Sequence, residues 1–196
     1  MSKPLLQVAL DHLDLPSALK ATRLLAAEVD VLEVGTILCY AEGARAVEVI
    51  RALYPEQTIL ADLKAADAGS TVAEIVFSKG ADWMTVICCA PYATMEAALK
   101  VAREYKGDVQ IELYGDWTFE QAEEWRKIGL TQAIYHRGRD AALAGQQWGE
   151  ADLAKIRRLV EMGFDVSVTG GLFAKDLGIF KGIPVKCFIA GREIGR

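Results

Sequence analysis

Two carboxylates and an amine stand close together after an apolar stretch of this chain. Asp62, Lys64 and Asp67 follow the run that begins at Ile59. If this run is a strand, Asp62 and Lys64 point to the same face, whereas Asp67 lies beyond the regular alternation. Burying one of these charges without a partner costs several kcal/mol. The group is therefore either a surface network of ion pairs or a reactive site.

The neighbours of Lys64 indicate which chemistry such a site would perform. Flanking carboxylates favour the protonated amine, which can stabilise an oxyanion or deliver a proton. They argue against a Schiff-base lysine, which needs a lowered pKa. Glu33 and Asp62 offer carboxylate oxygens that suit Mg²⁺, whose shell is completed by water and substrate. Zinc is disfavoured, because no histidine or cysteine cluster has zinc-site spacing.

Strand-like apolar runs alternate with amphipathic segments along the whole sequence. The expected strands are Leu5–Leu10, Val29–Val34, Thr58–Leu63, Trp83–Cys88, Val109–Leu113, Gln132–Tyr135, Phe164–Val168 and Val185–Ala190. The expected helices are Ser17–Ala27, Gly43–Leu53, Gly69–Ser78, Thr94–Tyr105, Thr118–Lys127 and Asp152–Met162. Eight such units with right-handed crossovers predict an α/β fold, a single (β/α)8 TIM barrel domain over residues 1–196.

An open doubly wound sheet is the alternative to the barrel. It is disfavoured because no Gly-x-Gly-x-x-Gly follows the first run, and because polar residues follow nearly every run. Local signals support the helix boundaries: Thr118 with Gln121 predicts a capping box, and Asp14 predicts a helix start. Nothing after Arg196 supplies an eighth helix, so we expect the final C-terminal helix of the barrel to be absent from this sequence.

The carboxyl ends of the predicted strands carry polar residues that one rim of a barrel would bring together. They are Asp11, Glu33, Asp62 with Lys64, Glu112, His136, Thr169, Gly170-Gly171 and Gly191-Arg192. Glycine N–H groups can approach an anion closely, and the last two strands of a barrel commonly end at a phosphate site. One glycine pair alone indicates only a turn. Glycines at both strand ends, with the forked donor Arg192, favour phosphate.

Composition excludes several other classes of protein. A net charge of −5 and a pI near 5.2 argue against nucleic acid as a partner. Neither a membrane-spanning apolar run nor a signal segment is present, so a cytoplasmic protein is expected. The four cysteines lack a Cys-x-x-Cys pair, and the two adjacent ones, Cys88 and Cys89, are interpreted as small buried hydrophobic residues. Trp117, Trp125 and Trp148 are predicted to pack rather than to stack on bases.

Longer motifs extend this picture to a known family. They are Glu33-Val-Gly-Thr36, Asp62-Leu-Lys-Ala-Ala-Asp67, Thr85-Val-Ile-Cys-Cys89, Gln110-Ile-Glu112, Tyr135-His-Arg-Gly-Arg-Asp140 and Gly145-Gln-Gln-Trp-Gly149. With these motifs the chain, from Leu5 to Arg192, resembles the 3-keto-L-gulonate 6-phosphate decarboxylases of the orotidine monophosphate decarboxylase superfamily. The superfamily's Asp-x-Lys-x-x-Asp signature corresponds to residues 62–67.

This resemblance implies a reaction and a set of residue roles. The reaction is Mg²⁺-dependent decarboxylation of 3-keto-L-gulonate 6-phosphate to L-xylulose 5-phosphate through an enediolate, in ascorbate or gulonate breakdown. The implied assembly is a homodimer with active sites at its interface. The implied catalytic roles are Mg²⁺ near Glu33 and Asp62, charge stabilisation by Lys64, and proton delivery by His136 and Arg139. Asp67 is implied to enter the site from the partner subunit. The implied substrate contacts come from Asp11, Glu112 and Thr169, and the implied phosphate site consists of Gly171, Gly191 and Arg192.

Two rival functions remain at this point. Hexulose-6-phosphate synthase is a related formaldehyde-dependent barrel that shares Glu33, Asp62, Lys64 and His136, but Glu112, Arg139 and Thr169 match the decarboxylase pattern. A catalytically silent sugar-phosphate-binding barrel is the second rival. Retention of the lysine, both signature aspartates and the histidine disfavours it.

Overall fold

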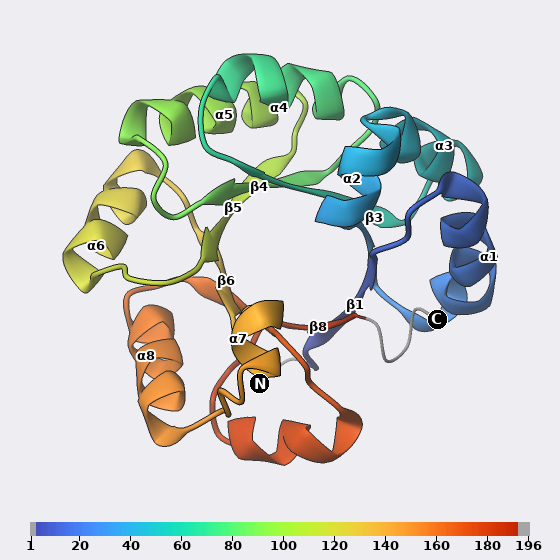
Figure 1. The fold of residues 1–196 in the computed structure, drawn as a ribbon. Helices are drawn as coiled ribbons and strands as arrows, with labels where there is room; N and C mark the ends of the chain where they lie inside the picture. Colours follow the sequence, from blue (N-terminus) through green and yellow to red (C-terminus); the bar gives the residue numbers. More distant parts are fainter. Residues whose placement is uncertain (1–2, 192–196) are drawn as a thin grey trace.

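Eight parallel strands close into a barrel with helices around it (Figure 1). The computed structural model describes residues 3–191. Its strands are β1 Leu5–Leu10, β2 Val31–Val34, β3 Thr58–Ala65, β4 Trp83–Ile87, β5 Asp108–Leu113, β6 Gln132–His136, β7 Asp165–Thr169 and β8 Cys187–Ala190. The sheet closes where Leu5 of β1 pairs in parallel with Cys187 of β8. The predicted TIM barrel is confirmed.

Helices follow the strands, and most of them cover the outside of the barrel (Figure 1). They are α1 Leu15–Leu25, α2 Thr36–Glu42, α3 Arg45–Leu53, α4 Gly69–Phe77, α5 Tyr92–Glu104, α6 Phe119–Ile128, α7 Arg139–Leu143 and α8 Glu150–Glu161, with 3₁₀ helices η1 Ala26–Glu28 and η2 Ala174–Phe180. The side chain of Asp14 caps α1 by accepting the N–H of Ser17 at 2.7 Å. Thr118 and Gln121 form the capping box of α6. Both predicted helix starts are confirmed.

Short helices are where the structure departs from the sequence-based prediction. One helix was predicted from Gly43, but α2 precedes it, and Gly43, at a φ of 62°, ends α2 before α3 begins. The five-residue α7 and the 3₁₀ helix η2 were also missed. A segment of one or two turns contains too few apolar positions for a helical period to be recognised. Figure 1 shows α7 on the barrel rim, inside the ring formed by the other helices.

Apolar packing is divided between the outside and the inside of the barrel. The main core lies between strands and helices and includes Val8, Leu32 and the fully buried Trp125. A separate small cluster contains Ala9, Ile134, Cys187 and Ile189. Three members of that cluster, Ala9, Ile134 and Ile189, also line the cavity described below. The small cluster is therefore the apolar floor of that cavity.

The tryptophans and cysteines allow two further predictions to be assessed. Trp117 and Trp148 pack edge-on or tilted against Tyr135, which confirms packing roles for them. Cys88 is buried as expected, but Cys89 is exposed. The prediction of a buried Cys89 was wrong, because β4 ends at Ile87 and Cys89 lies in the turn that follows. No helix within residues 3–191 is long and apolar enough to cross a membrane.

Candidate active site

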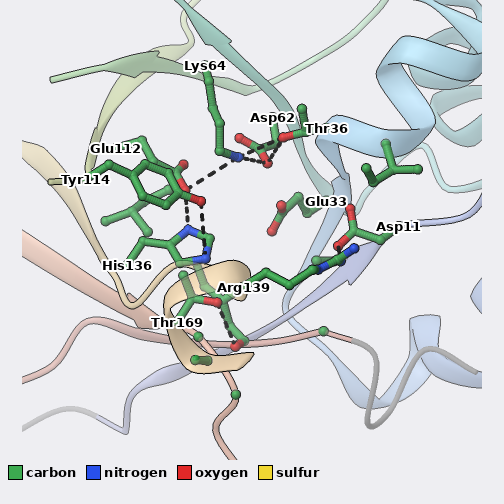
Figure 2. A pocket seen from close by; sticks show the side chains of 18 of the residues that line it. Asp11, Glu33, Thr36, Asp62, Lys64, Glu112, Tyr114, His136, Arg139 and Thr169 are labelled. Atoms are coloured by element: carbon green, nitrogen blue, oxygen red, sulfur yellow. Dashed lines mark hydrogen bonds and ion pairs between the residues drawn. The ribbon is translucent and has the colours of Figure 1, made fainter. Parts of the chain in front are cut away.

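A cavity of about 300 Å³ opens at the carboxyl ends of the strands. Nearly all the predicted site residues line it, and Figure 2 shows the labelled side chains among them pointing into one space. They are Asp11, Glu33, Asp62, Lys64, Glu112, His136, Arg139, Thr169, Gly171 and Gly191. Asp67 is exposed and does not line the cavity of its own chain. Arg192 lies outside the described residues.

Lys64 reaches the cavity from an irregular point of β3. The pairing of β3 with β4 shifts register between Ala61 and Ala65, and Lys64 has a φ of 48°. A non-glycine residue in this region carries backbone strain of about 1–3 kcal/mol. The N–H of Lys64 donates to Thr85 Oγ1 at 2.8 Å, which holds the irregularity in place. The strained backbone positions the one lysine side chain that lines the cavity within the described residues.

The ammonium of Lys64 lies between two buried carboxylates. Its Nζ forms an ion pair with Asp62 and lies 3.5 Å from Glu112 Oε1, while Thr36 Oγ1 accepts from it at 2.7 Å. Burial works to lower the pKa of Lys64, but the Glu112 and Asp62 carboxylates outweigh burial and raise that pKa. Lys64 is therefore protonated in the folded protein, as the sequence predicted. Figure 2 shows its side chain extending from β3 between the two acids.

Glu33 and Asp62 are buried side by side but differ in their partners. Burial works to raise the pKa of Asp62, yet Lys64 together with Thr36 and Thr85 holds it below the usual value. Glu33 is 7% exposed and accepts from Gln7 Nε2 at 2.6 Å. Its pKa is raised well above the usual value, first by burial and then by the charge of Asp62. Lys64 acts to lower the pKa of Glu33, but burial and the charge of Asp62 outweigh it, so the site disfavours a negative charge on Glu33 unless a further cation is present.

Glu33 and Asp62 are the two buried carboxyl groups that could serve as ligands of a metal ion. Within residues 3–191, His, Cys, Asp and Glu side chains form no group of three that could hold a metal ion. Mg²⁺ does not require one, because it commonly takes one or two protein carboxylates and fills its shell with water and substrate. A divalent cation between Glu33 and Asp62 would also offset their repulsion. The donor chemistry therefore fits Mg²⁺.

His136 ends β6 with a protein group beside each ring nitrogen. Its Nδ1 lies 2.5 Å from Glu112 Oε1, and its Nε2 lies 3.3 Å from the hydroxyl of Tyr114. The rings of Tyr114 and His136 have centroids 4.5 Å apart. Sequence reasoning missed Tyr114, although it follows Glu112 by two residues and so extends the same face of β5. Thr36 and Thr85, which bind Asp62, were missed as well.

Arg139 joins two distant parts of the chain across the cavity. It is the first residue of α7, and its Nη2 donates to Asp11 Oδ2 at 2.8 Å. Both side chains remain partly exposed, at 41% and 22%. The pair can therefore open or exchange partners at small energetic cost.

Small residues and tight backbone turns form the opposite side of the cavity. Thr169 ends β7 and its Oγ1 donates to the carbonyl of Ile189 at 3.3 Å. Gly170 and Gly171 follow with φ values of 110° and 60°. A Cβ on Gly170 would lie 2.1 Å from the Arg137 carbonyl oxygen, and one on Gly171 would lie 2.7 Å from Arg137 Nη2. Only glycine fits both positions without displacing Arg137.

Comparison with a family model shows to which protein family this barrel belongs. The model of the "Orotidine 5'-phosphate decarboxylase / HUMPS family" matches residues 4–196. The chain belongs to this family. It is also similar to a Shigella boydii protein named 3-keto-L-gulonate-6-phosphate decarboxylase UlaD, with 58% identity covering 99% of this chain and 90% of that protein.

Solved structures of other members of the family have the same barrel. A crystal structure of KGPDC from Streptococcus mutans, in complex with a sugar phosphate, has 53% identity and a TM-score of 0.95 over 96% of this chain and 88% of that one. The 3-keto-L-gulonate-6-phosphate decarboxylase of Vibrio cholerae has 46% identity and a TM-score of 0.92, covering 97% of this chain and 89% of that one. A 3-hexulose-6-phosphate synthase from Salmonella typhimurium has 27% identity and a TM-score of 0.89, covering 95% and 88%.

Proposed function

We propose that this chain decarboxylates 3-keto-L-gulonate 6-phosphate to L-xylulose 5-phosphate and CO₂, in the breakdown of L-ascorbate or a related gulonate. One observation carries the proposal. A protonated lysine lies between two buried carboxylates in a cavity whose other side is glycine backbone, in a chain 58% identical to a 3-keto-L-gulonate-6-phosphate decarboxylase.

A 3-keto acid needs no organic cofactor to lose CO₂. The carboxylate is attached to the carbon next to the carbonyl, so the electrons released on cleavage pass into an enediolate. The task of the protein is to stabilise the negative charge that develops on oxygen, and preorganised charges in a dry site are well suited to this. Lys64 Nζ, held by Asp62 and Thr36, is such a charge.

Two carboxylates support a role for Mg²⁺ in this proposal. Glu33 and Asp62 would hold the ion, which when bound supplies positive charge that stabilises adjacent oxygens of the substrate. Their burial in the cavity, at 7% and 5% exposure, gives that charge a low-dielectric surrounding. Asp62 would then have two tasks, because it also orients Lys64.

The remaining cavity residues support proton delivery and substrate binding. His136 and Arg139 are assigned to protonation of the product carbon, and Glu112 orients His136 through Nδ1. Asp11, Glu112 and Thr169 are assigned to contacts with substrate oxygens. Phosphate is assigned to Gly171 and Gly191, together with Arg192. Glycine backbone suits this role, because its N–H groups can approach an anion without hindrance from a side chain.

Exposure of Asp67 supports a homodimer in which this residue serves the partner's site. Asp67→Ala and Lys64→Ala proteins should each be inactive. Mixing them should restore about a quarter of wild-type activity, because about half of the dimers are mixed and each mixed dimer has one site that lacks neither group. Activity that stays absent after mixing, with dimers verified by light scattering, would contradict the shared site.

A direct assay separates this function from its nearest alternative. The protein is given 3-keto-L-gulonate 6-phosphate with Mg²⁺ and, separately, formaldehyde with ribulose 5-phosphate and Mg²⁺. We expect CO₂ release to be the faster reaction, since identity falls from 58% with the decarboxylase to 27% with the hexulose phosphate synthase. Faster synthesis of the hexulose phosphate would reverse the assignment. Absence of both reactions would favour a silent binding barrel.

A further inference from the structure

Tyr114 occupies a place in the cavity that the roles assigned above do not use. It follows the end of β5, lines the cavity, and places its hydroxyl 3.3 Å from Nε2 of His136 (Figure 2). We propose that the Tyr114 hydroxyl is the group through which a proton leaves His136 for the product carbon. This inference rests on the proposed function, because the proton acceptor is the enediolate formed by decarboxylation.

The surroundings of the His136 ring carry the argument. Nδ1 faces Glu112 at 2.5 Å and Nε2 faces Tyr114, so both ring nitrogens already have protein partners. Glu112 is 2% exposed and its oxygen also faces Lys64 at 3.5 Å, which closes that side of the ring. Tyr114 is only partly buried and borders the open cavity. The Tyr114 hydroxyl is therefore the protein group placed to carry a proton from Nε2 toward the cavity.

The transfer balances without any further reactant. The Nε2–H bond of the imidazolium breaks as an O–H bond forms on Tyr114. The original O–H bond of Tyr114 breaks as a C–H bond forms, using the electron pair of the enediolate. His136 is left neutral with its remaining proton on Nδ1, facing Glu112. The net change is one proton moved from the ring to carbon.

Two features keep the phenol suited to this transfer. Burial raises the pKa of Tyr114 and the nearby Glu112 carboxylate raises it further, so the phenol keeps its proton at neutral pH. Lys64 Nζ lies 5.9 Å from the centre of the Tyr114 ring, within the range of a cation–π contact. The ring is therefore held between the lysine and the histidine.

Tyr114→Phe tests the hydroxyl while keeping the ring. Tyr135→Phe is its matched control, since Tyr135 on the neighbouring strand donates to Asp152 at 2.8 Å and does not line the cavity. Thermal melts verify that both variants fold. Because general acid catalysis contributes about 10²–10⁴-fold and water can partly replace the hydroxyl, we expect kcat of Tyr114→Phe to fall about 10–100-fold with KM unchanged. Tyr135→Phe should keep both values.

A stereochemical measurement separates the route of the proton from a loss of packing. Reaction in D₂O places one deuterium on the new methylene carbon of the product, and NMR gives its distribution between the two faces. Tyr114→Phe should change this distribution, because water then protonates from a different position. An unchanged distribution with unchanged kcat would overturn the proposal, as would an equal loss of kcat in both variants.

A third measurement needs no substrate and so stands apart from the proposed function. The chain contains two histidines, so protein labelled with ¹⁵N only at histidine gives two ring systems, and a His12→Asn variant assigns them. Tyr114→Phe should move the Nε2 resonance of His136 and leave Nδ1 in place. An unmoved Nε2 resonance would overturn the relay by itself. Absence of turnover by the wild-type protein would instead overturn the proposed function.

Discussion

The two sides of the cavity use different physical means. On the side of β2, β3 and β5, Glu33, Asp62 and Glu112 are nearly fully buried charged groups around one ammonium. On the side of β7 and β8, the described lining residues offer glycine backbone and the Thr169 hydroxyl, beside the apolar Leu172 and Ile189. The first side has a high desolvation cost that only charge pairing offsets. On the second side the backbone of the glycine pair after β7 is restricted to positive φ values, but few charged groups are desolvated.

This contrast indicates where reaction and binding are separated. Buried charges with fixed partners cannot adapt to different substrates, but they stabilise charge that develops during a reaction. Glycine backbone binds an anion without selecting what is attached to it. We therefore expect changes on the acidic side to alter kcat and changes on the glycine side to alter KM.

The largest effect is expected at the centre of the acidic side. Lys64→Ala should lower kcat for CO₂ release by at least about 10²–10³-fold, because it removes the charge that faces the developing enediolate. Lys79→Ala is the control, since Lys79 pairs with Glu48 on the surface and its loss should leave kcat unchanged. Circular dichroism verifies the fold. Near-normal turnover by Lys64→Ala would remove this lysine from the mechanism.

A second effect on the acidic side concerns the metal ion. Chelation should suppress CO₂ release, and Mg²⁺ should restore it. Mg²⁺ should also raise the melting temperature of the wild-type protein, since a ligand bound only to the folded state stabilises it. Glu33→Gln should lose most of that rise, while Glu48→Gln, a surface change, should keep it. Full activity after rigorous metal removal would contradict the assignment of Glu33 and Asp62.

A smaller effect is expected on the glycine side. Gly171→Ala should raise KM about 10-fold and largely preserve kcat, because a Cβ would push against Arg137 Nη2 at 2.7 Å and displace the loop. Gly182→Ala is the control for backbone strain alone, since Gly182 also has a positive φ, of 88°, and a Cβ there meets nothing within 4 Å. A loss of kcat with KM unchanged in Gly171→Ala would erase the distinction between the two sides.

The smallest effect is on stability and depends on pH. The pKa of Glu33 is raised in the folded protein, mainly by burial, so the folded state binds this proton more tightly than the unfolded state. Its contribution to stability is fully present below the usual glutamate pKa and is lost as pH rises through the raised value. Without divalent ions, Glu33→Gln should therefore gain stability over wild type as pH rises. Urea unfolding from about pH 4 to about pH 8 measures the difference. A gap that narrows with rising pH would contradict the shifted pKa.

Much of the barrel could be predicted because its signals are local. The strand β1 Leu5–Leu10 was predicted at its observed bounds, and Thr118 caps α6 as expected, since alternation and capping depend on near neighbours in the sequence. The gathering of Glu33, Lys64 and His136 also followed from the sequence. Once the strands are parallel and closed, their carboxyl ends meet at one rim wherever they lie in the chain.

Contacts that depend on irregular backbone or short elements could be found only in the tertiary structure. Lys64 meets Thr85 and Glu112 at a register shift that no alternation rule contains. Arg139 meets Asp11 because the one-turn α7 lies over the rim, and Tyr114 meets His136 because neighbouring strands place their ends side by side. The sequence therefore determined which strands form and which end carries the charges. Packing decided which charges touch, because contact distances depend on small backbone displacements that local pattern does not encode.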